Sequence, residues 1–77
     1  MRNNNGLPDQ ATVERLRLAY PIGCRVELVS MDDPHTKLVP GDQGAVSYID
    51  STGTIFVDWD IGSSLGVVYG VDQIRKL

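Results

Sequence analysis

Cysteine is nearly absent from this sequence, since Cys24 is the only one among 77 residues. No internal disulfide and no multi-cysteine zinc site can therefore stabilise the fold, and Cys24 is expected to be a small buried thiol. The sequence also lacks a long apolar run and the charged-then-apolar layout of a signal peptide. A cytoplasmic protein with no membrane partner is expected.

Basic residues are scarce in the body of the chain. Between residues 26 and 74 the single base is Lys37, and the eight acids are Glu27, Asp32, Asp33, Asp42, Asp50, Asp58, Asp60 and Asp72. This segment has a net charge of −7, whereas six bases and two acids in the flanks give +4 and a total of −3. Duplex binding depends on lysine and arginine replacing condensed counterions, so direct nucleic-acid binding by this segment is not expected. The arginines of the N-terminal part could contact a phosphate or two.

The length of 77 residues allows one small domain. Such a domain buries only about 60% of the surface that its unfolded chain exposes, which favours binding on an outer face over an enclosed active site. Residues 1–8 are rich in asparagine, lack an apolar period and are predicted to be a flexible tail. We expect an N-terminal helix over residues 9–20 and a barrel over residues 21–77.

The predicted helix has one apolar stripe. Val13, Leu16 and Tyr20 follow the i, i+3, i+7 spacing of a short amphipathic helix. Asp9 or Thr12 can cap its start. The helix arginines are expected to face mostly solvent.

Alternating apolar residues and regularly spaced turn signals predict short β-strands in the rest of the chain. The expected strands cover residues 24–31, 45–50, 54–60, 65–69 and 74–77. A polar segment with two prolines, residues 32–40, is expected to be a long loop. The predicted fold is mainly β, a small five-stranded SH3-like barrel, closed or nearly closed, preceded by one short α-helix.

The motif residues add a resemblance to a known family. They are Tyr20-Pro21-x-Gly23-x-Arg25-Val26-Glu27-Leu28, Met31-x-Asp33-Pro34, Gly41-x-x-Gly44-x-Val46 and Gly53-x-Ile55-x-Val57-x-Trp59-Asp60-x-Gly62-x-x-Leu65. From about Tyr20 to the C-terminus the chain resembles the family catalogued as domain of unknown function 4314. The resemblance implies an SH3-like barrel from a Gram-positive bacterium, its phages or mobile elements, hence a bacterial host cell, and it implies no reaction. Cys24 stands where the family pattern leads us to expect a small polar residue.

The glycine-rich segments are interpreted as turns. Gly41, Gly44, Gly53 and Gly62 are expected at strand reversals with positive φ. Residues 41–44 lead into a strand, not a helix, so they do not predict a phosphate-binding loop. Residues 58–64 lack the third oxygen ligand and the closing glutamate of a calcium loop, and Asp60 is expected to accept hydrogen bonds from turn amides. No cofactor and no metal site is predicted.

Trp59 has two interpretations. It shares a strand face with Ile55 and Val57, which favours core packing, but an aromatic anchor with a polar edge can also form a recognition platform. Tyr48 and Tyr69, with Phe56, could extend that platform. The candidate partner-binding residues are Asp32, Asp33, His35, Tyr48, Asp58, Trp59, Asp60 and Tyr69.

The long loop carries two acids and the only histidine. In SH3 domains that bind proline-rich peptides, acids on this loop meet basic residues of the peptide, so Asp32 and Asp33 suggest a basic partner. The tyrosine-rich signature of those domains is absent. No nucleophile is placed in the sequence to make His35 a catalytic base, and no enzyme activity is predicted.

Three functions are compatible with these features. The first is a non-catalytic protein-binding module whose acidic surface docks a basic protein. The second follows from the phage resemblance, namely an inhibitor that occupies the cationic nucleic-acid channel of a host defence nuclease, as anti-CRISPR proteins do. The third is a structural or assembly accessory, a monomer or a homodimer formed through a strand edge or the helix.

Overall fold

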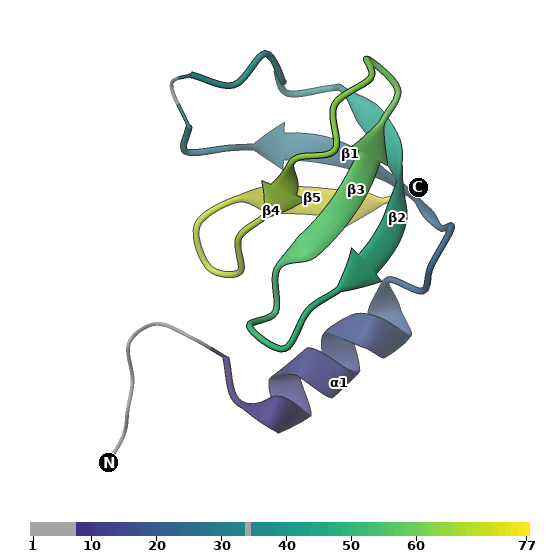
Figure 1. Cartoon of the computed structure of the whole chain (residues 1–77), viewed down its shortest axis with the longest axis vertical. Helices are drawn as coiled ribbons and strands as arrows, with labels where there is room; N and C mark the ends of the chain where they lie inside the picture. The colour runs from purple at the N-terminus through teal and green to yellow at the C-terminus, as the bar shows by residue number, and fades with distance from the viewer. Residues whose placement is uncertain (1–7, 34) are drawn as a thin grey trace.

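The fold is one five-stranded antiparallel sheet preceded by a short helix, in a computed structural model that describes residues 8–33 and 35–77 (Figure 1). The sheet order is β4-β3-β2-β1-β5. The elements are α1 (Gln10–Ala19), β1 (Arg25–Ser30), β2 (Gln43–Ile49), β3 (Ile55–Trp59), β4 (Gly66–Val67) and β5 (Gln73–Lys76). The mainly-β class predicted from the sequence is confirmed. Residues 1–7 of the predicted tail and Pro34 of the predicted loop lie outside the described residues.

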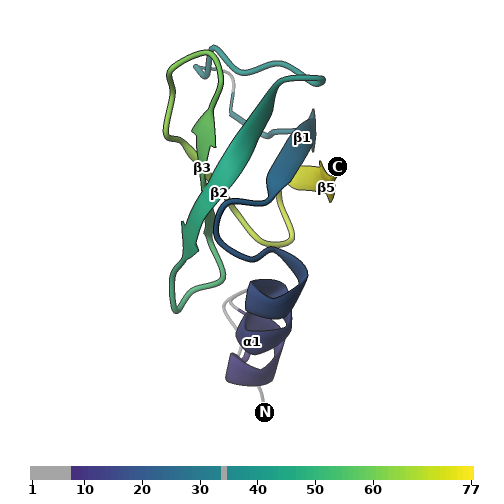
Figure 2. The same ribbon diagram turned by 90° about the vertical axis from the view of Figure 1, so that its right-hand side faces the viewer.

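Helix α1 begins and ends at capped positions. The Asp9 carboxylate accepts a hydrogen bond from the Thr12 backbone N–H at 2.8 Å, and the Tyr20 N–H donates to the Leu16 carbonyl at 2.8 Å. These bonds satisfy backbone groups that a helix end leaves free. Val13 is buried, while Leu16 and Tyr20 pack against the core, as the apolar stripe predicts. Both views place α1 at one end of the sheet (Figures 1 and 2). No helix in the described part of the chain is long and apolar enough to cross a membrane.

The core lies on one face of β1, β2 and β3. These strands alternate between buried and more exposed residues, as expected for a sheet with one face in the core. In β2 the alternation changes after Val46, because a bulge shifts the pairing with β3 between Val46 and Tyr48. As a result Tyr48 faces outward and Ile49 is buried. The buried core residues are Val13, Val26, Leu28, Leu38, Val46, Ile49, Ile55, Val57, Trp59 and Val67.

Strand β4 is shorter than the predicted strand over residues 65–69. The reason is a turn that begins at Val68, whose carbonyl accepts hydrogen bonds from the N–H groups of Val71 and Asp72. The Asp72 carboxylate also accepts a bond from the Val68 N–H at 2.9 Å. Val68 thus has its backbone groups engaged in the turn, and the ladder with β3 stops at Val67. Within the described residues β4 and β5 form the two sheet edges and do not pair, so the ladder is not closed; the sequence had left both a closed and a nearly closed arrangement open.

Gly44 does not occupy a turn, contrary to the sequence prediction. It is buried within β2, opposite Trp59 of β3, and its φ is not positive. A Cβ at this position would lie 2.5 Å from the Asp58 carbonyl oxygen and 2.7 Å from Val57 Cγ1. Gly44 is therefore required by the close approach of β3, whereas Gly41, with φ of 102°, makes the turn before β2.

Candidate interaction surfaces

Trp59 is a core residue. Its side chain is only 3% exposed, and its indole Nε1 donates a hydrogen bond to the Leu65 carbonyl at 2.9 Å. This bond satisfies the polar edge that would otherwise point to a partner. Core packing, the interpretation favoured from the strand pattern, is confirmed, and Trp59 does not belong to an exposed platform.

Several of the acids hold turns together. The carboxylates of Asp33, Asp42, Asp50 and Asp72 each accept at least one hydrogen bond from a backbone N–H. Asp50 accepts bonds from the Thr52 N–H and hydroxyl and from the Thr54 N–H, which closes the β2–β3 hairpin. Asp72 binds the Asp32 N–H at 2.8 Å and the Val68 N–H, and so connects two loops. The positions of these carboxylates are therefore fixed by the backbone.

Two further acids form ion pairs. Both guanidinium Nη atoms of Arg25 donate to the Asp60 carboxylate, one of them at 2.9 Å. Asp60 therefore engages a side chain, and the prediction that it bonds turn amides is wrong. Arg75 donates to Glu27 at 3.1 Å across the β1–β5 pair. Both pairs are partly exposed, so each contributes little to stability.

Three carboxyl groups have lowered pKa values, which predicts a loss of stability in acid. The Thr12 side chain lowers the pKa of Asp9, the Thr52 hydroxyl that of Asp50, and the Arg25 guanidinium that of Asp60. A folded-state pKa below the unfolded value gives stability that is present at neutral pH and lost as protons bind in acid. The melting temperature is therefore expected to stay level from about pH 7 to about pH 5 and to fall below about pH 4.

Thermal unfolding followed by circular dichroism across this range measures the effect. Asp50→Asn removes one titrating group but retains an acceptor oxygen, so its melting temperature should fall less steeply with acid than that of the wild type. Equal slopes for the two proteins would contradict a contribution from Asp50.

The long loop between β1 and β2 faces the β3–β4 turn. An open hollow of about 410 Å³ lies between them. It is lined on the loop side by Asp33, His35 and Lys37 and on the turn side by Ile61 and Ser63. The His35 N–H donates to the Asp33 carboxylate at 3.0 Å, a bond within the loop itself. The His35 imidazole forms no hydrogen bond or ion pair with another described residue. The described residues of this hollow form a polar surface.

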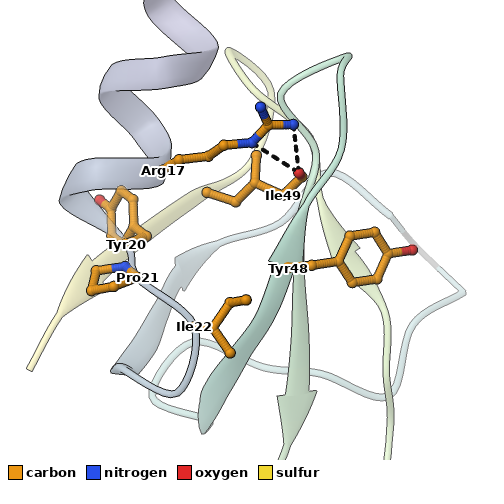
Figure 3. A pocket seen from close by; sticks show the side chains of 6 residues that line it. All are labelled: Arg17, Tyr20, Pro21, Ile22, Tyr48 and Ile49. Atoms are coloured by element: carbon orange, nitrogen blue, oxygen red, sulfur yellow. Dashed lines mark hydrogen bonds between the residues drawn. The ribbon is translucent and has the colours of Figure 1, made fainter.

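Tyr48 belongs to a different surface, a groove between the end of α1 and β2 (Figure 3). We call it the helix groove, and it is lined by Arg17, Tyr20, Pro21, Ile22, Tyr48 and Ile49. The Arg17 guanidinium donates to the Ile49 carbonyl through Nε at 3.2 Å and Nη2 at 3.0 Å, so α1 is bonded directly to β2. Arg15 and Arg17 are both exposed, as the sequence predicts, but the prediction did not include the hydrogen bonds that the Arg17 head group makes to β2. Tyr48 stacks on Phe56, with ring centroids 4.5 Å apart.

Tyr69 lines a third hollow, on the other side of Tyr20. This hollow of about 330 Å³ lies between α1 and the turn before β5, and its apolar wall includes Leu16, Ile55 and Ile74. Asp72 and Gln73 provide its polar rim. Tyr20 lines both this hollow and the helix groove, so the two surfaces adjoin along the end of α1.

The eight predicted partner-binding residues do not form one patch. Asp33 and His35 share one hollow, whereas Tyr48 and Tyr69 lie on two others. Trp59 is buried, and the Asp60 carboxylate is held by Arg25. The side chains of Asp32 and Asp58 are exposed and accept no hydrogen bond from the rest of the described chain.

Sequence reasoning missed Arg17 and Ile22 as surface residues of interest. Ile22 is 77% exposed although it is strongly apolar. The signal available in the sequence was its position between Pro21 and Gly23, where neither a helix nor a strand could bury it. The carbonyl that binds Arg17 belongs to a strand 32 residues away, and no local pattern indicates it.

The described residues bring no three of the side chains of His, Cys, Asp and Glu into a cluster that could hold a metal ion. A family model described as a domain of unknown function (DUF4314) matches residues 9–77, a range that includes α1 as well as the sheet. No curated protein and no solved structure matches the chain.

Proposed function

Because the chain belongs to the DUF4314 family, whose description names no activity, we propose a function from geometry and charge. The chain is a non-catalytic protein-binding module, and its acidic surface docks onto a basic patch of another protein. The observation that carries this proposal is how few of its acids have basic partners within the fold.

Of the eight acids between residues 26 and 74, only Glu27 and Asp60 form ion pairs in the described part of the chain. The other six are Asp32, Asp33, Asp42, Asp50, Asp58 and Asp72. Against them this segment has one base, Lys37, so a strong negative charge remains after the ion pairs are counted. Four of the six are held by backbone N–H groups and need little reorganisation to meet a partner's cations. Complementary charge of this kind steers association and selects the partner.

Asp32 and Asp58 provide the direct test, because neither side chain accepts a hydrogen bond from another described residue. We expect the immobilised chain to capture a basic protein from bacterial lysate. With that protein purified, the association rate should fall at least several-fold between about 0.05 and 0.3 M salt. The double variant Asp32→Asn/Asp58→Asn should associate more slowly than the wild type at low salt, as measured by surface plasmon resonance.

The matched control is Glu14→Gln, which removes an exposed acid on α1, outside the acidic segment. It should leave the association rate unchanged. An association rate that does not depend on salt, or equal rates for the double variant and the wild type, would refute docking through the acidic surface. Capture of nucleic acid alone would do the same.

The strand order and the long loop between β1 and β2 support the finer assignment of the sheet as an SH3-like barrel. If the chain comes from a phage or mobile element, as the resemblance implies, the same acidic surface suits the cationic nucleic-acid channel of a defence nuclease. A purified nuclease whose DNA binding is competitively blocked by the chain would distinguish this inhibitor from a general docking module. Sedimentation at several concentrations would distinguish both from an assembly accessory that acts as a homodimer.

A further inference from the structure

The helix groove has the form of a peptide-docking site. Ile22 on one side is 77% exposed and Tyr48 on the other is 51% exposed, while Ile49 between them is buried. The groove encloses about 340 Å³, and most of its wall is apolar. Large apolar side chains that frame a hollow are typical of interfaces, where an aromatic or aliphatic residue of the partner fills the centre.

Arg17 gives this groove a positive charge. Among the described residues that line the wall it is the only charged one, and its bonds to the Ile49 carbonyl use Nε and Nη2. Nη1 donates to no other described residue, and Figure 3 shows it as the one guanidinium nitrogen without a dashed line, pointing away from the Ile49 carbonyl. The nearby Asp50 carboxylate is engaged by Thr52 and Thr54 of the hairpin. Arg17 is therefore held in place with donors available to a carboxylate.

We propose that the helix groove docks a short segment of a second protein in which a bulky apolar side chain lies beside an aspartate or glutamate. The apolar side chain occupies the hollow between Ile22 and Tyr48, and the carboxylate meets Arg17. This partner chemistry is opposite in charge to that of the acidic surface. The inference goes beyond the proposed function, because it concerns a separate surface and a different ligand.

The charge of the groove also argues against a second copy of the chain as its occupant. A twofold dimer places the same patch of both copies in one interface, which would bring two Arg17 side chains together. Like charges at a shared interface oppose association. An acidic–apolar segment meets no such opposition.

Selection of random twelve-residue peptides displayed on phage, with the purified full chain as bait, tests the proposal. We expect enriched peptides to share an aromatic or aliphatic residue next to an acid. The most enriched peptide is then synthesised, and its affinity for the chain is measured by fluorescence anisotropy. Ile22→Gln should weaken binding about tenfold, because it removes the burial of one large aliphatic side chain.

Leu18→Gln is the matched control, because Leu18 is 83% exposed on α1 but does not line the groove. It should bind the peptide as the wild type does. Arg17→Gln should weaken binding about fivefold and reduce its salt dependence, whereas Arg17→Lys should retain most of both. Circular dichroism verifies that each variant is folded.

Three results would overturn the proposal: enriched peptides that are basic, equal losses from Ile22→Gln and Leu18→Gln, or self-association of the chain that Ile22→Gln abolishes. The last result would make a second copy the occupant. Failure here leaves the acidic surface untouched, since Asp32→Asn/Asp58→Asn changes neither Ile22 nor Arg17.

Discussion

Replacing Trp59 by alanine is expected to lower the free energy of unfolding by about 3–5 kcal/mol, as is usual for a buried aromatic side chain. The indole is 3% exposed and donates a hydrogen bond to the Leu65 carbonyl. The variant therefore loses apolar burial, leaves a cavity and leaves that carbonyl without its hydrogen-bond donor. A domain of 77 residues has a total stability of roughly 4–12 kcal/mol, so this loss is a large fraction of it. Urea unfolding followed by circular dichroism measures the difference.

Two further variants serve as comparisons for Trp59→Ala. Trp59→Phe keeps most of the apolar volume and should cost about 1–3 kcal/mol, and it provides a measurable value if the alanine variant does not fold. Tyr48→Ala removes an exposed aromatic ring and should cost less than about 1.5 kcal/mol, through its stacking on Phe56. A Trp59→Ala protein as stable as Tyr48→Ala would mean that Trp59 is not part of the core.

Gly44→Ala is expected to destabilise the protein by about 3 kcal/mol or more, a large effect for the addition of one methyl group. The new Cβ would lie 2.5 Å from the Asp58 carbonyl oxygen and 2.8 Å from Trp59 Cα. Both are backbone atoms of β3, so neither can move aside without separating the β2–β3 pair. The midpoint of urea unfolding should shift strongly toward lower denaturant.

Gly62→Ala is the control for this prediction. Gly62 has a φ of 96° and no heavy atom within 4 Å of an added Cβ, so alanine there has backbone strain but no clash. Its cost should be about 1–2 kcal/mol. If Gly44→Ala were no more destabilising than Gly62→Ala, the close approach of the two strands would not be a constraint on the sequence.

The fold class follows from local patterns that the sequence displays directly. The stripe of Val13, Leu16 and Tyr20 predicted both the helix and the face that it buries, and alternation predicted the central strands. The edge strand β4 was predicted too long, because the turn that ends it depends on the carboxylate of Asp72, four residues after Val68. Gly44 was placed in a turn, because an approach by another strand cannot be seen in a local sequence.

The candidate surfaces were harder to predict than the fold. The acids were identified, but their hydrogen bonds to turns and to Arg25 and Arg75 depend on distant segments. Tyr48 was grouped with Trp59, since the alternation gives no sign of the β2 bulge that turns Tyr48 outward. The helix groove joins the end of α1 to Ile49, and this contact exists only in the folded chain.

The Asp72 side chain links the long loop to the turn after β4, so the two segments are expected to move together. One carboxylate oxygen accepts a hydrogen bond from the Asp32 N–H at the start of the long loop, and the other accepts one from the Val68 N–H at the start of the turn after β4. A displacement of either segment therefore strains the hydrogen bonds of the same side chain. A protein that bound the long loop would therefore displace the polar rim of the hollow beside Tyr69, and occupation of one site would alter the other through this single carboxylate.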